Sequence, residues 1–320
     1  MKFSLSHNWR YQWLSRAIKF RQSGFTLLEL LVALLIGSII ITVLLQLVLE
    51  LLQVERRETA VDNTQRDMRR ALEYIASDVR EAVYVYSTPS TSAAVDSIKD
   101  ALPGGANNTV LAFWRLDPID DVSFLNCPGM PAAQRNECNV LKVRQATYSL
   151  VVYKLVENDG NPTWPGRARI VRYRLPKYQT MTATSLNSTP GYVEPVSRTN
   201  PELTFENWRA TATPTGVNPV VLVDYVDEPD SSINDVSILT CPVGMMRNPV
   251  DASQSTSFFT CVQDPAGAEE GNLNQDVEIF LRGNFEPASG GGLIRALSES
   301  SGLPTLRTAV LVRGVLDKNQ

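Results

Sequence analysis

The chain has 320 residues, of which 43% are hydrophobic and 20% charged, and its net charge is −4. This is the composition of a globular protein without the basic surface that nucleic-acid binding requires, so no nucleic-acid partner is expected. The single histidine is His7. The rest of the chain can therefore build no Ser-His-Asp or Cys-His catalytic arrangement and no histidine-ligated metal site.

The N-terminus combines a basic segment with an apolar one. Residues 1–24 contain five lysines and arginines and no acid, and Leu30–Leu49 contains 20 consecutive uncharged, mostly apolar residues. As a helix this run is about 30 Å long, the thickness of a bilayer's hydrocarbon core. The positive-inside rule then predicts a cytoplasmic N-terminus and an exported body. The alternative, an ordinary secretory signal, has a shorter apolar stretch and a small-residue cleavage site.

Glu29 is a carboxylate at the start of this apolar segment. Insertion of a carboxylate at the bilayer centre costs about 3 kcal/mol, so it needs an ion-pair partner or a route to the membrane interface. Cleavage between Gly24 and Phe25 creates a positive α-amino group on Phe25, one helical turn from Glu29 or facing it from a neighbouring subunit. The positive end of the helix dipole also favours a carboxylate here. The alternative is that Glu29 reaches the cytoplasmic interface without any cleavage.

The segment Arg21–Ala33 reads RQSGFTLLELLVA and resembles the type IV prepilin cleavage and methylation motif. The resemblance implies that a prepilin peptidase cuts after Gly24 and methylates the new N-terminal Phe25. It also implies that Glu29 guides assembly by pairing with the N-terminus of an adjacent subunit. Gln46 departs from the family, because many major pilins have a helix-breaking proline there, and helix melting is less clearly encoded.

A long helix is predicted next. No proline occurs before Pro89, and beyond the apolar run apolar residues recur three or four positions apart among charged ones. This spacing predicts an amphipathic continuation, with a coiled coil as the alternative. The whole helix is expected from about Thr26 to about Tyr84, about 90 Å long at 1.5 Å per residue. The apolar stripe of its amphipathic half needs a surface to pack against, which the downstream β segments can supply.

All 19 prolines and most glycines lie at or after Pro89, which indicates a loop-rich β domain. The turn-rich connector Asn158–Pro162 suggests a hairpin. The fold class expected is α+β, a type IV pilin fold in which the long helix packs on an antiparallel sheet with long loops. The strands expected from composition and alternation are Thr109–Leu116, Ala146–Val156, Arg167–Leu175, Val220–Val226, Val277–Leu281 and Leu306–Leu316.

The segments Ala71–Tyr86 and Val110–Arg115 resemble the larger minor pilins and pseudopilins of the PilW and GspJ type, most closely the cyanobacterial hormogonium polysaccharide secretion pseudopilins. This implies a subunit of a type IV pilus-like machine that supports gliding motility and polysaccharide export. Its partners would be other pilins or pseudopilins, an inner-membrane assembly platform and membrane lipid. The chain lacks a phosphate-binding P-loop, so a separate ATPase must supply the energy. Alternatives are a type II secretion pseudopilin, a membrane-tethered polysaccharide-binding module or adhesin, and a membrane-anchored hydrolase.

Four regions are predicted. Residues 1–24 are a cytoplasmic leader peptide, and residues 25–53 are the transmembrane and assembly half of the long helix. Residues 54–86 are its amphipathic half, and residues 87–320 are a periplasmic or extracellular β-rich domain. The protein is expected in the plasma (inner) membrane as a single-pass protein, and in a pilus or pseudopilus after assembly.

Four cysteines lie in the predicted exported body, which suggests two disulfides. The local pairs Cys127–Cys138 and Cys241–Cys261 are favoured over the two other connectivities. A zinc site is disfavoured because the short spacing between cysteines is missing.

No catalytic residue, metal or cofactor is predicted, and the protein is expected not to be an enzyme. The acidic stretch Asp224–Asp230, with Asp235, does not have EF-hand spacing, so it is interpreted as a solvated loop rather than a calcium site. Asp117–Asp121 is interpreted in the same way. Trp164 is expected to fold back on its own sheet, with stacking on a sugar or another pilin as the alternative.

Overall fold

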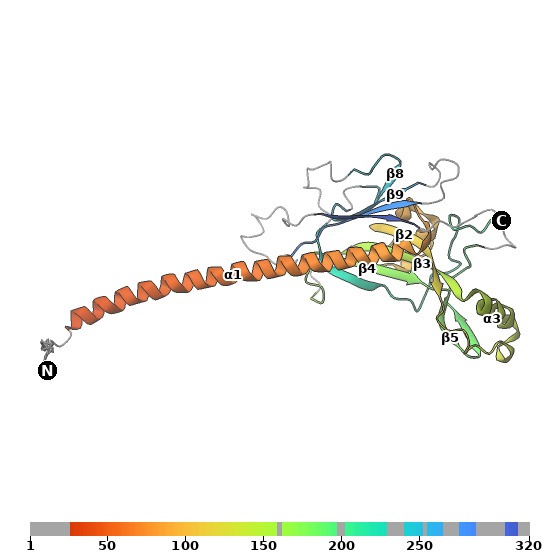
Figure 1. The fold of residues 1–320 in the computed structure, drawn as a ribbon, viewed down its shortest axis with the longest axis horizontal. Coiled ribbons are helices and arrows are strands. Elements are labelled where there is room, and N and C mark those ends of the chain that lie inside the picture. The colour runs from red at the N-terminus through yellow and green to blue at the C-terminus, as the bar shows by residue number, and fades with distance from the viewer. Residues whose placement is uncertain are drawn as a thin grey trace, which may run out of the picture. The chain divides into compact units, whose positions relative to one another are not determined.

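The computed structural model describes residues 26–158, 162–196, 202–228, 240–251, 255–264, 275–285 and 305–312. The chain divides into two compact units, Met1–Arg56 and Arg57–Gln320. One uninterrupted helix, α1 (Leu27–Arg80), begins in the first unit and ends in the second (Figure 1). The lack of proline and the single glycine in this stretch permit such a length.

The second unit contains the sheets, and each pair of neighbouring strands is antiparallel. The larger sheet has the order β1-β2-β3-β4-β7, the smaller has the order β11-β10-β9-β8, and β5 and β6 form a separate hairpin. The strands are β1 (Ala82–Val85), β2 (Thr109–Pro118), β3 (Ala146–Glu157), β4 (Ala168–Leu175), β5 (Tyr178–Thr182), β6 (Ser185–Ser188), β7 (Val220–Val226), β8 (Met245–Asn248), β9 (Phe258–Gln263), β10 (Asp276–Leu281) and β11 (Leu306–Leu311).

Short helices fill the connections of the second unit. They are the α-helices α2 (Ala93–Ser97) and α3 (Ala132–Arg144) and the 3-10 turns η1 (Pro89–Thr91), η2 (Lys99–Ala101) and η3 (Cys127–Gly129). In Figure 1, α3 and β5 lie next to each other at one end of the sheets. Their buried side chains form a small core of their own, separate from the core that contains the helix.

The main core forms between the end of α1 and both sheets. The buried stripe of α1 consists of residues three or four apart, which places them on one helical face. The stripe packs with Phe113, Tyr153, Ile279 and other apolar side chains of the two sheets. Its apolar members are Met68, Ala71, Leu72, Ile75, Ala76 and Val79.

Gly283 shows how closely a strand end approaches α1. A Cβ atom at this position would lie 2.8 Å from side-chain carbons of both Met68 and Thr64. Gly283 also forms the β-bridge with Val226 that joins the two sheets. The absence of a side chain therefore permits the helix and both sheets to meet at one point.

The predicted α+β fold is confirmed. The six expected strands are present, although β11 ends at Leu311 and residues 313–316 of the expected strand lie outside the described part. Two expectations were wrong in detail. The helix ends at Arg80, and Ala82–Val85 pairs with β2 as a strand, because this valine- and tyrosine-rich segment finds a sheet edge to complete. The expected single sheet is divided into two sheets and a hairpin.

Candidate functional site

The first turn of α1 is held by Thr26. The backbone N–H of Glu29 donates to Oγ1 of Thr26 at 3.3 Å and to its carbonyl oxygen at 3.0 Å. Thr26 is therefore the N-cap, and the order Thr-Leu-Leu-Glu has the spacing of a capping box. The sequence signal for this cap is the capping-box spacing between Thr26 and Glu29, which the prepilin motif contains.

Glu29 lies in this first turn and is exposed. A carboxylate here interacts favourably with the positive end of the helix dipole. Gly24 and Phe25 lie outside the described residues, so cleavage between them and methylation of Phe25 stay predictions.

Apolar side chains cover every side of the first half of α1. Twenty large hydrophobic residues between Leu27 and Val54 are exposed within the chain. Full burial of such a side chain contributes about 1.5–3 kcal/mol, so this segment gains tens of kcal/mol when lipid or other helices cover it. In the described part of the chain, α1 is the one helix with the length and apolar composition to cross a membrane.

The polar side chains inside this apolar segment form hydrogen bonds within the helix. The hydroxyl of Ser38 donates to the carbonyl of Leu35 at 2.8 Å, and that of Thr42 donates to the carbonyl of Ser38 at 2.8 Å. Hydroxyls satisfied in this way need no water, which lipid cannot supply. The helix also continues through Gln46 without a break, so an intact helical span is what this sequence encodes.

The other end of α1 is attached to the larger sheet through Asp78. This buried carboxylate accepts hydrogen bonds from Arg172 Nε at 2.8 Å and Tyr153 OH at 2.6 Å, and it also pairs with Arg115. Burial favours a higher pKa for Asp78, but the bonds from Arg172 and Tyr153 and the charge of Arg115 outweigh it and hold the pKa below 3.8. Asp78 is thus an ionised clamp between helix and sheet.

Asp117 was wrongly interpreted as part of a solvated loop. It lies near the end of β2 with its side chain buried, and its carboxylate binds Arg115, Arg174 and the hydroxyl of Ser149. Arg115 lies between the two buried carboxylates, Asp117 and Asp78. The sequence offered no signal for the pairing with Ser149 and Arg174, because these partners come from β3 and β4.

The stretch that begins at Asp224 was also wrongly interpreted in its described part. Asp224 accepts hydrogen bonds from Asn158 Nδ2 at 2.7 Å and from the backbone N–H of Gly166 at 3.0 Å. Asp227 is buried and pairs with Arg282 at 2.8 Å. These carboxylates hold loops and strand ends together. Asp230 and Asp235 lie outside the described residues.

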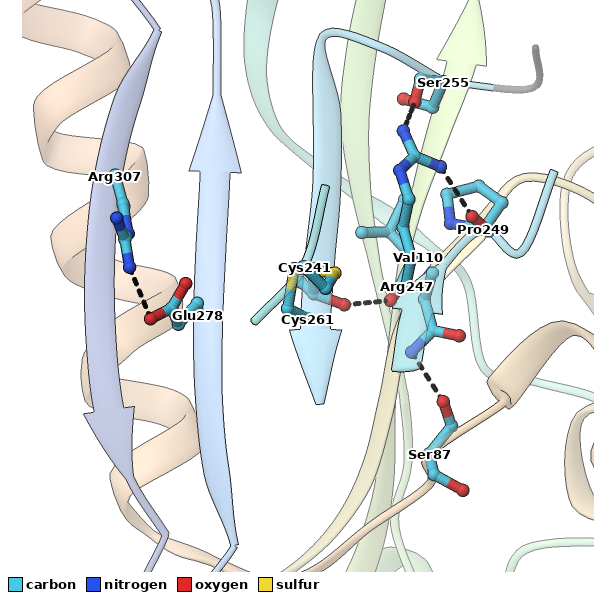
Figure 2. The surroundings of a disulfide bond; sticks show 11 residues. Ser87, Val110, Cys241, Arg247, Pro249, Ser255, Cys261, Glu278 and Arg307 are labelled. Atoms are coloured by element: carbon cyan, nitrogen blue, oxygen red, sulfur yellow. Dashed lines mark hydrogen bonds and ion pairs between the residues drawn. A yellow bond between two sulfur atoms is a disulfide. The ribbon is translucent and has the colours of Figure 1, made fainter. Parts of the chain in front are cut away.

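Both cysteine pairs are local. Cys127 and Cys138 join η3 to α3, and Cys241 and Cys261 join a loop to β9, each with 5.5 Å between Cα atoms. Figure 2 shows the Cys241–Cys261 disulfide, with Arg247 bonded to the carbonyl of Pro249 at 2.7 Å. Two further hydrogen bonds connect this region to the larger sheet and its β1–η1 connection, from Thr260 to the Val110 carbonyl and from Asn248 to the Ser87 carbonyl, both at 2.8 Å.

The geometry offers no metal centre in the described ranges, since no three metal-ligating side chains of the histidine, cysteine, aspartate or glutamate type gather there. Trp164 is half-buried. The exposed apolar half of α1, capped by Thr26, is the candidate functional surface in this part of the chain.

Residues 19–45 match the prokaryotic N-terminal methylation motif. The match covers the end of the basic segment, the predicted cleavage point and the first part of α1, and it supports a type IV pilin-like protein. No curated protein and no solved structure matches the chain significantly.

Proposed function

We propose that this chain is a minor pilin or pseudopilin of a type IV pilus-like machine and acts as a structural subunit rather than an enzyme. The observation that carries the proposal is the methylation motif at residues 19–45, which coincides with a capped helix that is apolar on all sides. The motif supports processing by prepilin peptidase and assembly with other pilins.

The chain is inserted with its N-terminus in the cytoplasm and its body across the plasma membrane, and it is cut between Gly24 and Phe25. The apolar half of α1 then leaves lipid for a bundle of similar helices. Glu29 favours the correct axial position in this bundle, because a misplaced copy leaves its carboxylate unpaired in apolar surroundings. An inner-membrane assembly platform and a separate ATPase drive this transfer.

Within this class, the specific role that we propose is support of gliding motility and polysaccharide export. This part of the proposal rests on the resemblance of Ala71–Tyr86 and Val110–Arg115 to the hormogonium pseudopilins. A type II secretion pseudopilin is the alternative within the same class, and a tethered polysaccharide-binding module or adhesin is the alternative outside it.

Mass spectrometry of the mature N-terminus tests the processing. We expect the chain to begin at an N-methylated Phe25. An intact Met1 in the assembled protein contradicts the proposal.

A Glu29→Ala variant tests assembly. We expect normal membrane insertion but strongly reduced incorporation into filaments, with Glu50→Ala as the matched control on the same helix. Equal incorporation of the Glu29→Ala variant and the wild type contradicts the role given to Glu29.

A further inference from the structure

Among the described residues, the smaller sheet has an open edge. β11 is its terminal strand, paired with β10 on one side. Val312 N–H donates to the Gln275 carbonyl at 2.9 Å, which fixes the phase of the antiparallel ladder. Alternate residues from Leu306 to Val312 then turn their backbone groups toward β10, and the residues between them turn theirs outward. The outward backbone groups belong to Arg307, Ala309 and Leu311.

Within the described ranges these outward groups have no hydrogen-bond partner. All three residues are exposed, Leu311 to 60%, and none of the described residues bonds to their backbone groups. A row of unpaired N–H and C=O groups is a template for another extended segment.

A groove lies beside this edge, between α1 and β11, with a volume of about 300 Å³. Leu72, Ala76 and Leu306 provide its apolar lining, and Arg69, Glu73 and Arg80 line it along the helix. Arg69 and Arg80 are separated by about 16 Å at 1.5 Å per residue.

The groove has an excess of positive charge. Neither Arg69 nor Arg80 has an ionic partner in the described part of the chain, whereas the nearby Arg66 and Arg70 pair with Asp62 and Asp67. Glu73 supplies one carboxylate between them. The guanidinium of Arg307 is engaged elsewhere, since it pairs with Glu278 at 2.6 Å (Figure 2). Two guanidinium groups that no described carboxylate pairs with, beside this strand edge, favour a segment that brings carboxylates.

We propose that β11 and this groove bind an extended, acidic segment of a partner protein, which adds as a further strand to β11. Backbone bonds to Arg307, Ala309 and Leu311 supply affinity, and carboxylates directed at Arg69 and Arg80 supply specificity. Acidic residues four apart on a strand lie on one face about 13 Å apart, within reach of both long arginine side chains. A second copy of β11 fits less well, because it brings no carboxylate to these arginines. The inference goes beyond the proposed function and does not depend on it.

The test uses the full chain in lipid nanodiscs and a fluorescent peptide of alternating valine and threonine with glutamate at its third and seventh positions. We expect the peptide to bind at least tenfold more tightly than a version with lysine at these two positions. The double variant Arg69→Gln/Arg80→Gln should lose roughly tenfold in affinity, as expected for two exposed ion pairs. The matched control, Arg66→Gln/Arg70→Gln, should change affinity by less than about twofold. Glu73→Gln should strengthen binding.

A backbone variant separates strand addition from simple charge attraction. Ala309→Pro removes one outward N–H and leaves the bonds to β10 in place, and proline is tolerated on strand edges. We expect loss of peptide binding with an unchanged unfolding temperature. Hydrogen exchange should show fast exchange of the Ala309 and Leu311 amides without the peptide and slow exchange with it.

Several outcomes overturn the proposal. Protected Ala309 and Leu311 amides in the free monomer would mean that the chain covers its own edge. Protection that grows with protein concentration would assign the edge to a second copy. Equal binding of the glutamate and lysine peptides, or full binding by the arginine double variant, would show that the groove does not select an acidic segment.

Discussion

The two halves of α1 share one backbone conformation and differ in what covers their apolar side chains. Between Leu27 and Val54 large apolar residues are exposed on every side, whereas from Met68 to Val79 they form one buried stripe. The second half finds its partner in the sheets of the same chain. The first half finds no such cover among the described residues, which is why we propose it as the membrane and assembly segment.

The largest expected effect comes from making the same isoleucine-to-alanine substitution in each half of α1. Ile75→Ala, at a fully buried position, should lower the free energy of unfolding of the body by about 4 kcal/mol. Ile40→Ala, at a position 53% exposed in the chain, should leave that free energy unchanged. Chemical denaturation of both variants in detergent, followed through tryptophan fluorescence, measures the difference. Equal destabilisation by both would end the distinction between the halves.

Asp78 provides the next test, because it fixes the second half to the sheet. Asp78→Asn should destabilise the body by about 3 kcal/mol, since Arg172 and Arg115 lose their shared buried carboxylate. Asp62→Asn, in an exposed ion pair with Arg66, should cost about 0.5 kcal/mol or less.

The pKa of Asp78 also predicts a pH dependence. Because this pKa is lowered in the folded state, the stabilisation is complete well above the ordinary value of 3.8 and is lost as pH falls through the folded pKa. The fall in unfolding free energy below about pH 4 should be smaller in Asp78→Asn than in the wild type. Parallel pH profiles of the two proteins would show that Asp78 does not contribute.

The disulfides sharpen the comparison within the body. Cys127 and Cys138 are 11 residues apart, and Cys241 and Cys261 are 20 apart. Loops of this length predict that replacing either pair with serines costs about 3 kcal/mol. Thermal unfolding should show both losses, while the helicity of the apolar half stays unchanged. A change in that helicity would show that the halves of α1 are coupled.

The smallest expected effect is at the helix start. Thr26→Ala removes the cap on Glu29 and should cost the first turn about 1 kcal/mol. The amide of Glu29 should then exchange faster in lipid. Thr42→Ala is the control, because its hydroxyl bonds inside the helix. The same exchange rate in both variants would mean that Thr26 does not hold the first turn.

Much of the fold could be predicted because its signals are local. The lack of proline and the change from continuous to periodic apolar spacing predicted α1, and alternation predicted β2, β3, β4, β7, β10 and β11. The helix α3 was missed because only Cys138 and Leu141 of its residues are buried, too few to produce a helical period. β8 and β9 were missed because they lie in the long, polar stretch between β7 and β10, which was interpreted as one connection.

The candidate site divides in the same way. The sequence by itself determined the methylation motif around Glu29 and the apolar segment, since each depends on residues close together in the chain. The end of the leader at Gly24 stays a prediction. Only the tertiary structure decided that Asp117 and Asp227 are buried ion-pair partners, because Arg174 in β4 and Arg282, just after β10, lie more than 50 residues away in the sequence. The place of β11 at the edge of the smaller sheet, as far as the structure describes the chain, likewise depends on strand order. A pattern of side chains predicts that a strand exists, but which of its two edges finds a partner depends on the whole sheet.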